Sequence, residues 1–230
     1  KVTPTSRDEM FLITKTWADT WEKAEESLTS SLKVLRTDHV DLCHIHCIGA
    51  LDPKKVIGER GCLAYLLNAK EKGLTRFVGM TGHNKISFFP EVLNTGEIDV
   101  MMVVLNFVDC HLYDFRNALF PLAKKHGTAV VAMKIFGGRG KEGQPTPWGQ
   151  YRRPGPSQMP KDLLQDALRY ALSMDGVDIA LTGVYSGQEI VQNAGWAKEF
   201  KPLTAEEMTS LEEKGKQMSA DWGTRFGEPV

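Results

Sequence analysis

The 230-residue sequence lacks the features of a membrane or nucleic-acid-binding protein. It has no apolar run near the roughly 18 residues that cross a bilayer, and no basic-then-apolar segment at its start. Its 28 basic and 29 acidic residues are interspersed, so that the net charge is only -1 and no face of one sign is indicated. We therefore predict no membrane partner and no nucleic-acid partner.

Cysteine is scarce, and its spacing excludes a CxxC motif. The four cysteines are Cys43, Cys47, Cys62 and Cys110. The first two lie in or beside an apolar run, so buried reduced thiols are the simplest interpretation. Reduced thiols predict a reducing compartment and hence a cytoplasmic protein. The chain begins at Lys1 in polar sequence rather than at Met, which predicts a processed or truncated start.

Short β-branched runs alternate with longer segments of helical period, the pattern of repeated βα units around a parallel sheet. The predicted strands cover residues 10–15, 40–46, 76–81, 99–105, 129–134 and 179–184. The predicted helices cover residues 21–35, 61–72, 85–93, 117–126, 162–173, 187–194 and 204–218. Because no change in composition divides the chain, we predict a single domain over residues 1–230.

The number of βα units indicates an incomplete barrel. A complete (β/α)8 TIM barrel takes about 250 residues, so six units here predict strands 3 to 8 of such a barrel, with its N-terminal part missing. A doubly wound open sheet is the alternative, disfavoured because no GxGxxG motif follows the first strand. The long Gly- and Pro-rich stretch at 137–160 follows a strand, where barrels place active-site loops.

Two residues at predicted strand ends are candidates for catalysis. Lys15 ends the first strand and His46 the second, and barrel active sites lie at the carboxyl ends of strands. A desolvated lysine beside a carboxylate could tune a proton donor. His44 shares a strand face with His46, so the two could instead bind a metal ion, with His83 as a further ligand, or simply pack in the core. A metal-dependent hydrolase is therefore one alternative.

Two further segments could contact a ligand. MTGHN at 80–84 ends the third strand and could hold the polar edge of a flat molecule, although Gly and Asn are also ordinary turn residues. TGVYSGQEIVQN at 182–193 leads from the last strand into a helix whose first N–H groups suit an anion.

Four segments in order resemble the aldo-keto reductase superfamily, and the likeness covers nearly the whole chain. They are ITKT, SLKVLRTDHVDLCHIH, MTGHN and TGVYSGQEIVQN. The resemblance implies a (β/α)8 barrel and an NAD(P)-dependent oxidoreductase that transfers hydride between a nicotinamide and a small carbonyl or alcohol substrate. It also implies that Lys15 and His46 are the catalytic lysine and histidine.

The resemblance implies cofactor contacts along the second half of the chain as well. The implied positions are Thr81, Gly82, Met102, Met133, Lys134, Gly183, Tyr185, Glu189 and Asn193. Thr81 and Gly82 replace a common Ser and Asn, and Met102 and Met133 replace a glutamine and a ring-stacking tyrosine. Glu189 stands where NADPH-preferring members often have an arginine, and a carboxylate repels the 2'-phosphate. The expected cofactor is NADP or NAD, with a preference for NAD.

The family's proton-donating tyrosine and its lysine-paired aspartate belong to the first two βα units, which this sequence lacks. The tyrosines present fall outside that motif: Tyr65, Tyr113, Tyr151, Tyr170 and Tyr185. A non-catalytic cofactor-binding or interaction protein is therefore the main alternative. No cysteine follows Cys110, so the four-cysteine iron-sulfur segment of some members is not expected. The substrate and the oligomeric state are not predicted.

Overall fold

The computed structural model describes residues 6–138 and 157–230. Six strands form one sheet in the order β1-β2-β3-β4-β5-β6, so each strand pairs with the next one in the sequence. The pairs β1–β2, β2–β3 and β5–β6 are parallel. Helices separate consecutive strands, which confirms the predicted α/β fold.

The strands agree with the sequence pattern in position and differ in length. They are β1 (Ile13–Thr16), β2 (Val40–Ile45), β3 (Thr75–Gly82), β4 (Val100–Val104), β5 (Ala129–Met133) and β6 (Ile179–Ala180). The helices are α1 (Trp21–Leu35), α2 (Pro53–Ile57), α3 (Cys62–Glu71), α4 (Phe89–Leu93), α5 (Phe115–His126), α6 (Leu164–Ser173), α7 (Gly187–Lys198) and α8 (Ala205–Trp222). The short α2 was not predicted, and both α7 and α8 extend four residues beyond their predicted ends.

The edge strands are shorter than predicted. Strand β1 begins at Ile13 rather than at residue 10, because the Leu12 N–H donates to a carboxylate oxygen of Asp41 (2.7 Å) instead of to a backbone carbonyl. Strand β6 ends at Ala180 rather than at residue 184. The Leu181 N–H still donates to the Ala132 carbonyl oxygen (2.8 Å). The predictions for both outer ends were therefore wrong by a few residues.

The chain forms two compact units. Unit 1 contains Lys1–Met102, Ala118–Ala129 and Val230, and unit 2 contains Val103–Asn117 and Val130–Pro229. Each unit is described by itself below. The single domain over residues 1–230 stays a prediction.

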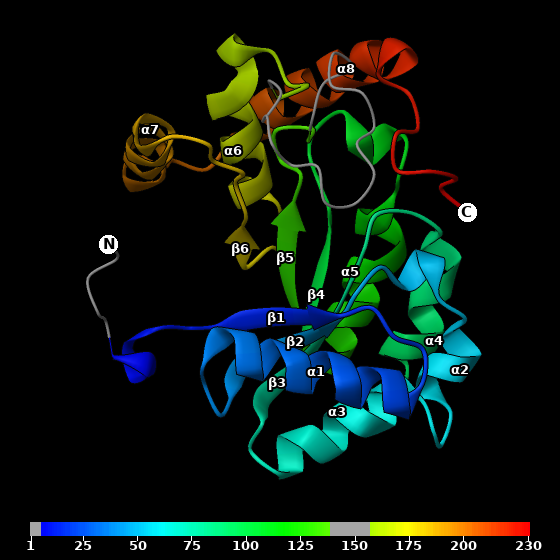
Figure 1. The fold of residues 1–230 in the computed structure, drawn as a ribbon. Coiled ribbons are helices and arrows are strands. Elements are labelled where there is room, and N and C mark those ends of the chain that lie inside the picture. Colours follow the sequence, from blue (N-terminus) through cyan, green and yellow to red (C-terminus); the bar gives the residue numbers. More distant parts are fainter. Residues whose placement is uncertain (1–5, 139–156) are drawn as a thin grey trace. The chain divides into compact units, whose positions relative to one another are not determined.

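In unit 1, helices α1 and α3 contact each other and pack beside strands β1 and β3 (Figure 1). Strand β2 is buried at every position, as expected of a parallel strand covered on both faces. Helix α1 contributes Ala24 and Leu28 to the core, and the ring of Trp21 meets that of Tyr65 edge-on at 5.4 Å. This packing supports β2 as the central element of the unit.

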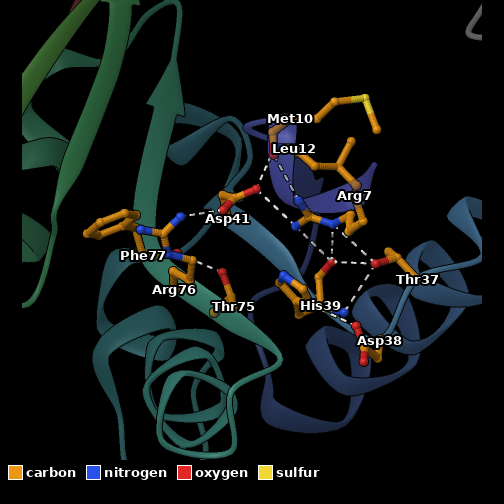
Figure 2. A network of polar contacts seen from close by, with 10 residues as sticks. All are labelled: Arg7, Met10, Leu12, Thr37, Asp38, His39, Asp41, Thr75, Arg76 and Phe77. Carbon is orange, nitrogen blue, oxygen red and sulfur yellow. Dashed lines mark hydrogen bonds and ion pairs between the residues drawn. The ribbon is translucent and has the colours of Figure 1, made fainter. Parts of the chain in front are cut away.

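A buried carboxylate anchors the amino end of β2. Asp41 forms ion pairs with Arg7 (2.9 Å) and Arg76 (2.7 Å), and Figure 2 shows the two guanidinium groups reaching it from different sides. Burial alone would raise the pKa of Asp41, but the Leu12 N–H and the two arginines outweigh burial and hold it at about 2. Asp41 is therefore ionised at neutral pH and ties three segments together.

In unit 2, helix α8 is fixed at both ends. Its N-cap is Thr204, which forms a capping box with Glu207. At its other end, the Trp222 Nε1–H donates to the buried carboxylate of Asp109 (2.9 Å), which also accepts from Asn106 Nδ2 (2.6 Å). Burial raises the pKa of Asp109. These contacts hold the C-terminal helix against the segment that follows β4.

Cys43, Cys47, Cys62 and Cys110 all lie in the described ranges, and none of them forms a disulfide bond. Cys43 and Cys62 are buried, whereas Cys47 and Cys110 are half-buried. Burial raises the pKa of the Cys43 thiol to about 12 and that of Cys110 to about 11. Within the described ranges, no helix is long and apolar enough to span a membrane.

Candidate active site

The carboxyl ends of β1, β2 and β3 gather the candidate catalytic residues of unit 1. The parallel register pairs Lys15 with His44 and Ile45 with Met80. The His46 N–H continues the ladder by donating to the Thr16 carbonyl oxygen (2.9 Å). Lys15, His46 and Thr81 therefore come to the same end of three neighbouring strands.

The ring of His46 is held by a hydroxyl group on the next strand. Its Nδ1 lies 2.9 Å from Thr81 Oγ1, and the same oxygen accepts a hydrogen bond from the Cys47 N–H (3.1 Å). Thr81 is fully buried and His46 is half-buried. The hydroxyl of Thr81 thus contacts the catalytic histidine implied by the sequence, a contact that the sequence did not predict.

Other side chains surround His46 at this end of the sheet. The indole ring of Trp17 meets its imidazole edge-on, with centroids 5.7 Å apart. Cys47 adopts a left-handed backbone conformation with φ 58°, and its Sγ lies 3.9 Å from His83 Nδ1. Trp17 was not among the predicted site residues. Its position two residues after Lys15, directly beyond the end of β1, was the signal that could have identified it.

His44 lies one layer below His46 and is fully buried. Burial, together with the positive charges of Lys15 and His46, lowers its pKa to about 3. A Cβ atom on Gly79 would collide with the His44 ring and would lie 2.8 Å from the Val100 carbonyl oxygen. His44 is therefore a neutral core imidazole, and glycine on the neighbouring strand leaves the space that it occupies.

Three other predicted positions lie in unit 1. The side chain of Lys15 is exposed. A Cβ atom on Gly82 would collide with the buried ring of Phe89, so packing explains why glycine replaces the family's asparagine. Met102, in β4, is buried.

Unit 2 contains the other predicted cofactor positions, and the first two are Met133, the last residue of β5, and Lys134 directly after it. Met133 is buried, and its carbonyl oxygen accepts from the Leu105 N–H (3.0 Å). Lys134 has φ 58°, a conformation that is uncommon for a residue with a side chain. Its carbonyl oxygen accepts from Asn106 Nδ2 (3.0 Å). Residues of this kind often occur at functional sites.

The remaining positions lie at the start of α7. Ser186 is the N-cap, and its Oγ accepts from the Glu189 N–H (3.2 Å), while the Glu189 carboxylate accepts from the Tyr185 N–H (2.7 Å). A Cβ atom on Gly183 or Gly187 would meet nothing within 4 Å. Open space beside the first N–H groups of a 12-residue helix fits the binding of an anionic group. Further along the helix, Asn193 is buried.

Tyr65 is the one tyrosine that the described ranges contain in unit 1, and it does not lie at the strand ends. Tyr65 lies on α3 in contact with Trp21, and burial raises its pKa. In unit 2, the Tyr113 hydroxyl donates to the Gly227 carbonyl oxygen (2.9 Å), and that of Tyr170 donates to Glu212 (3.0 Å). Residues 139–156 of the predicted loop, Tyr151 included, lie outside the described residues.

In residues 6–138 and 157–230, no group of three or more His, Cys, Asp or Glu side chains could hold a metal ion. His44 is also fully buried, so within the same residues the alternative of a metal site at His44 and His46 gains no support.

Comparisons with known proteins identify the family of this chain. The model of the aldo/keto reductase family matches residues 1–149. The chain belongs to the aldo/keto reductase family. The resemblance noted in the sequence is thereby confirmed, and the parallel sheet with alternating helices is part of the (β/α)8 barrel fold of this family.

The similar proteins include characterised enzymes. An L-galactose dehydrogenase of Arabidopsis thaliana is 26% identical over 212 residues, covering 83% of this chain and 63% of that protein. A methylglyoxal reductase of Salmonella typhi is 39% identical over 128 residues, covering 55% of this chain and 46% of that protein. The holo form of an aldo-keto reductase from Bacillus halodurans superposes with a TM-score of 0.67 at 25% identity, covering 91% of this chain and 73% of that chain. This aldo/keto reductase chain spans less than two thirds of the length of the two curated relatives.

Proposed function

We propose that this aldo/keto reductase is an NAD(P)-dependent oxidoreductase that transfers hydride between a nicotinamide and a small carbonyl or alcohol substrate. The observation that carries the proposal is the placement of His46 at the carboxyl end of β2. Thr81 Oγ1 contacts its ring, and Lys15 lies at the same end of the adjacent strand β1. Barrel enzymes perform their chemistry at this end of the strands.

A nicotinamide, when bound, would supply hydride to the carbonyl carbon, and the oxygen would take up its proton from water. His46 donates a hydrogen bond to the carbonyl oxygen and orients the substrate. The exposed amine of Lys15 supplies positive charge beside the oxygen, where negative charge develops. Since no tyrosine of the chain matches the family's proton donor, the proposal assigns no donor among these 230 residues.

The start of α7 is proposed to hold the adenosine end of the cofactor. Gly183 and Gly187 leave space beside the helix N-terminus, where N–H groups favour an anion. The Glu189 carboxylate accepts a hydrogen bond from the Tyr185 N–H. Its negative charge would repel a 2'-phosphate, which favours NAD. This preference stays a prediction, and Asn193, Met133 and Lys134 stay proposed contacts.

For the substrate, we propose a small aldehyde or ketone. One relative is named a methylglyoxal reductase and another a dehydrogenase of a sugar. Both names describe small, polar carbonyl or alcohol compounds. Methylglyoxal is therefore a suitable first probe.

The test combines cofactor binding with turnover. Thermal unfolding of the 230-residue chain is measured with NADH and with NADPH, because a ligand that binds only the folded state raises the melting temperature. Oxidation of the same cofactors by methylglyoxal is then followed by absorbance. His46→Ala is expected to lower kcat/KM at least about 100-fold. His39→Ala is the matched control, because His39 lies beyond the opposite end of β2 and pairs with Asp38.

Each result has a distinct meaning. A raised melting temperature with turnover that depends on His46 supports the reductase. A raised melting temperature without turnover supports the alternative of a non-catalytic cofactor-binding protein. A melting temperature unchanged by either cofactor contradicts both.

A further inference from the structure

We infer that Thr81 is a positioning residue that holds His46 in the tautomer with its hydrogen on Nε2. The inference deepens the proposed function, because it assigns the group that makes His46 a hydrogen-bond donor to the substrate. It rests on the direction of two hydrogen bonds at one buried hydroxyl group.

The first of these bonds has a fixed direction. A threonine hydroxyl offers one hydrogen and two lone pairs. The Cys47 N–H is a backbone donor and lies 3.1 Å from Thr81 Oγ1, so the hydroxyl must act as its acceptor. Cys47 stands in a left-handed turn directly after His46, and this turn brings its N–H to the hydroxyl. One lone pair of Thr81 Oγ1 is therefore used by the hydrogen bond from the Cys47 N–H.

The second bond then determines the tautomer. Thr81 Oγ1 lies 2.9 Å from His46 Nδ1. If the hydroxyl donates to Nδ1, the hydrogen of Thr81 and the lone pair of His46 are both satisfied. If Nδ1–H donated instead, the hydroxyl would accept twice, and its own hydrogen would have no acceptor within the described ranges. Because Thr81 is fully buried, an unsatisfied hydrogen is strongly disfavoured.

The tautomer decides what His46 can do to a carbonyl group. With its hydrogen on Nε2, the ring donates to the substrate oxygen and polarises the bond that receives the hydride. With the hydrogen on Nδ1, it would present a lone pair to the lone pairs of the oxygen. Thr81 therefore acts through His46, and its contact explains a buried hydroxyl at a position first assigned to cofactor binding.

The test measures the tautomer directly, without turnover. Long-range 1H–15N correlation spectra of the 230-residue chain with 15N-labelled histidine distinguish the two neutral forms, at about pH 8 so that the rings are neutral. The His46 signals are identified by their loss in His46→Gln. The expected result is an Nε2–H ring in the native chain and in Thr81→Ser. Thr81→Val, which replaces the hydroxyl by a methyl group, is expected to lose this preference.

Two results would overturn the inference. One is an Nδ1–H ring in the native chain, which needs no variant and is therefore independent of whether Thr81→Val folds. The other is an unchanged Nε2–H ring in a folded Thr81→Val. Because the spectra need neither cofactor nor substrate, failure of the inference and failure of the proposed reductase are separate outcomes.

Kinetics distinguish a positioning role from a cofactor contact. In the reductase assay, Thr81→Val is expected to lower kcat about 10-fold or more, with the Kd for the cofactor unchanged, and Thr81→Ser is expected to restore kcat. A variant that weakens cofactor binding and leaves kcat intact would also contradict the inference.

Discussion

The two ends of strand β2 differ in how their buried polar side chains are stabilised. At the amino end, the ionised carboxylate of Asp41 is only 4% exposed and is matched by two guanidinium groups (Figure 2). At the carboxyl end, His44 is kept neutral, and His46 and Thr81 share a hydrogen bond. Ion pairs therefore anchor one end of the strand, whereas imidazole and hydroxyl groups joined by a hydrogen bond lie at the other end.

The difference between the two ends of β2 indicates that the amino end serves stability and that the carboxyl end is available for the proposed chemistry. A paired buried charge resists rearrangement, because removing one partner leaves the others without compensation. In barrels the amino ends of strands are associated with stability and the carboxyl ends with catalysis, and the proposed function would give β2 the same division.

The largest expected effect is at the charged end. Asp41→Ala should lower the free energy of unfolding by about 3–5 kcal/mol, because it removes the acceptor of the Leu12 N–H and the ion-pair partner of Arg7 and Arg76. Urea unfolding at pH 7 measures this. Asp38→Ala is the control, since that side chain is 93% exposed, and it should change stability little. A loss below about 1 kcal/mol for Asp41→Ala would remove the anchoring role.

The next largest effect is the loss of stability at acidic pH that His44 causes. Its pKa is about 3 in the folded chain against 6.5 for the unperturbed group, so between these values the unfolded state binds one more proton. Stability must therefore fall as the pH is lowered from about 7 to about 5, by about 2 kcal/mol from this residue. His44→Leu should lack this component. Urea unfolding of both chains at the two pH values tests it, and equal pH dependences would show that His44 is charged when folded.

A smaller loss is expected where glycine makes room for His44. Gly79→Ala should destabilise the chain by about 1–3 kcal/mol, because the added Cβ would collide with the ring. The loss should shrink in the presence of His44→Ala, which a double-mutant cycle of unfolding free energies measures. Additive losses would place the cause in the Val100 carbonyl contact instead.

The smallest expected effect is the difference in stability loss between the alanine variants of Arg76 and Arg7. The side chain of Arg76 is 60% exposed, whereas that of Arg7 is 21% exposed. Arg76→Ala should therefore cost less than about 1 kcal/mol, since exposed ion pairs contribute little. Arg7→Ala should cost more, and thermal unfolding of the two variants compares them. Equal losses would mean that exposure does not govern this network.

Much of the fold could be predicted from local sequence. The helix at 21–35 was predicted with the bounds that α1 has in the structure, because its apolar residues recur with helical period. The short α2 was missed because five residues contain too little of that period. For the candidate site, the strand-end positions of Lys15, His46 and Thr81 were predicted, but not the contacts among them.

The sequence by itself determined the order of the elements, the family resemblance and the placement of Lys15 and His46 at strand ends. These depend on local periodicity and on motifs of a few residues. Only the tertiary structure decided that Thr81 holds His46 and that Arg76 pairs with Asp41, contacts that each join residues 35 positions apart. Such contacts depend on the register of neighbouring strands, which backbone pairing sets and no local pattern encodes.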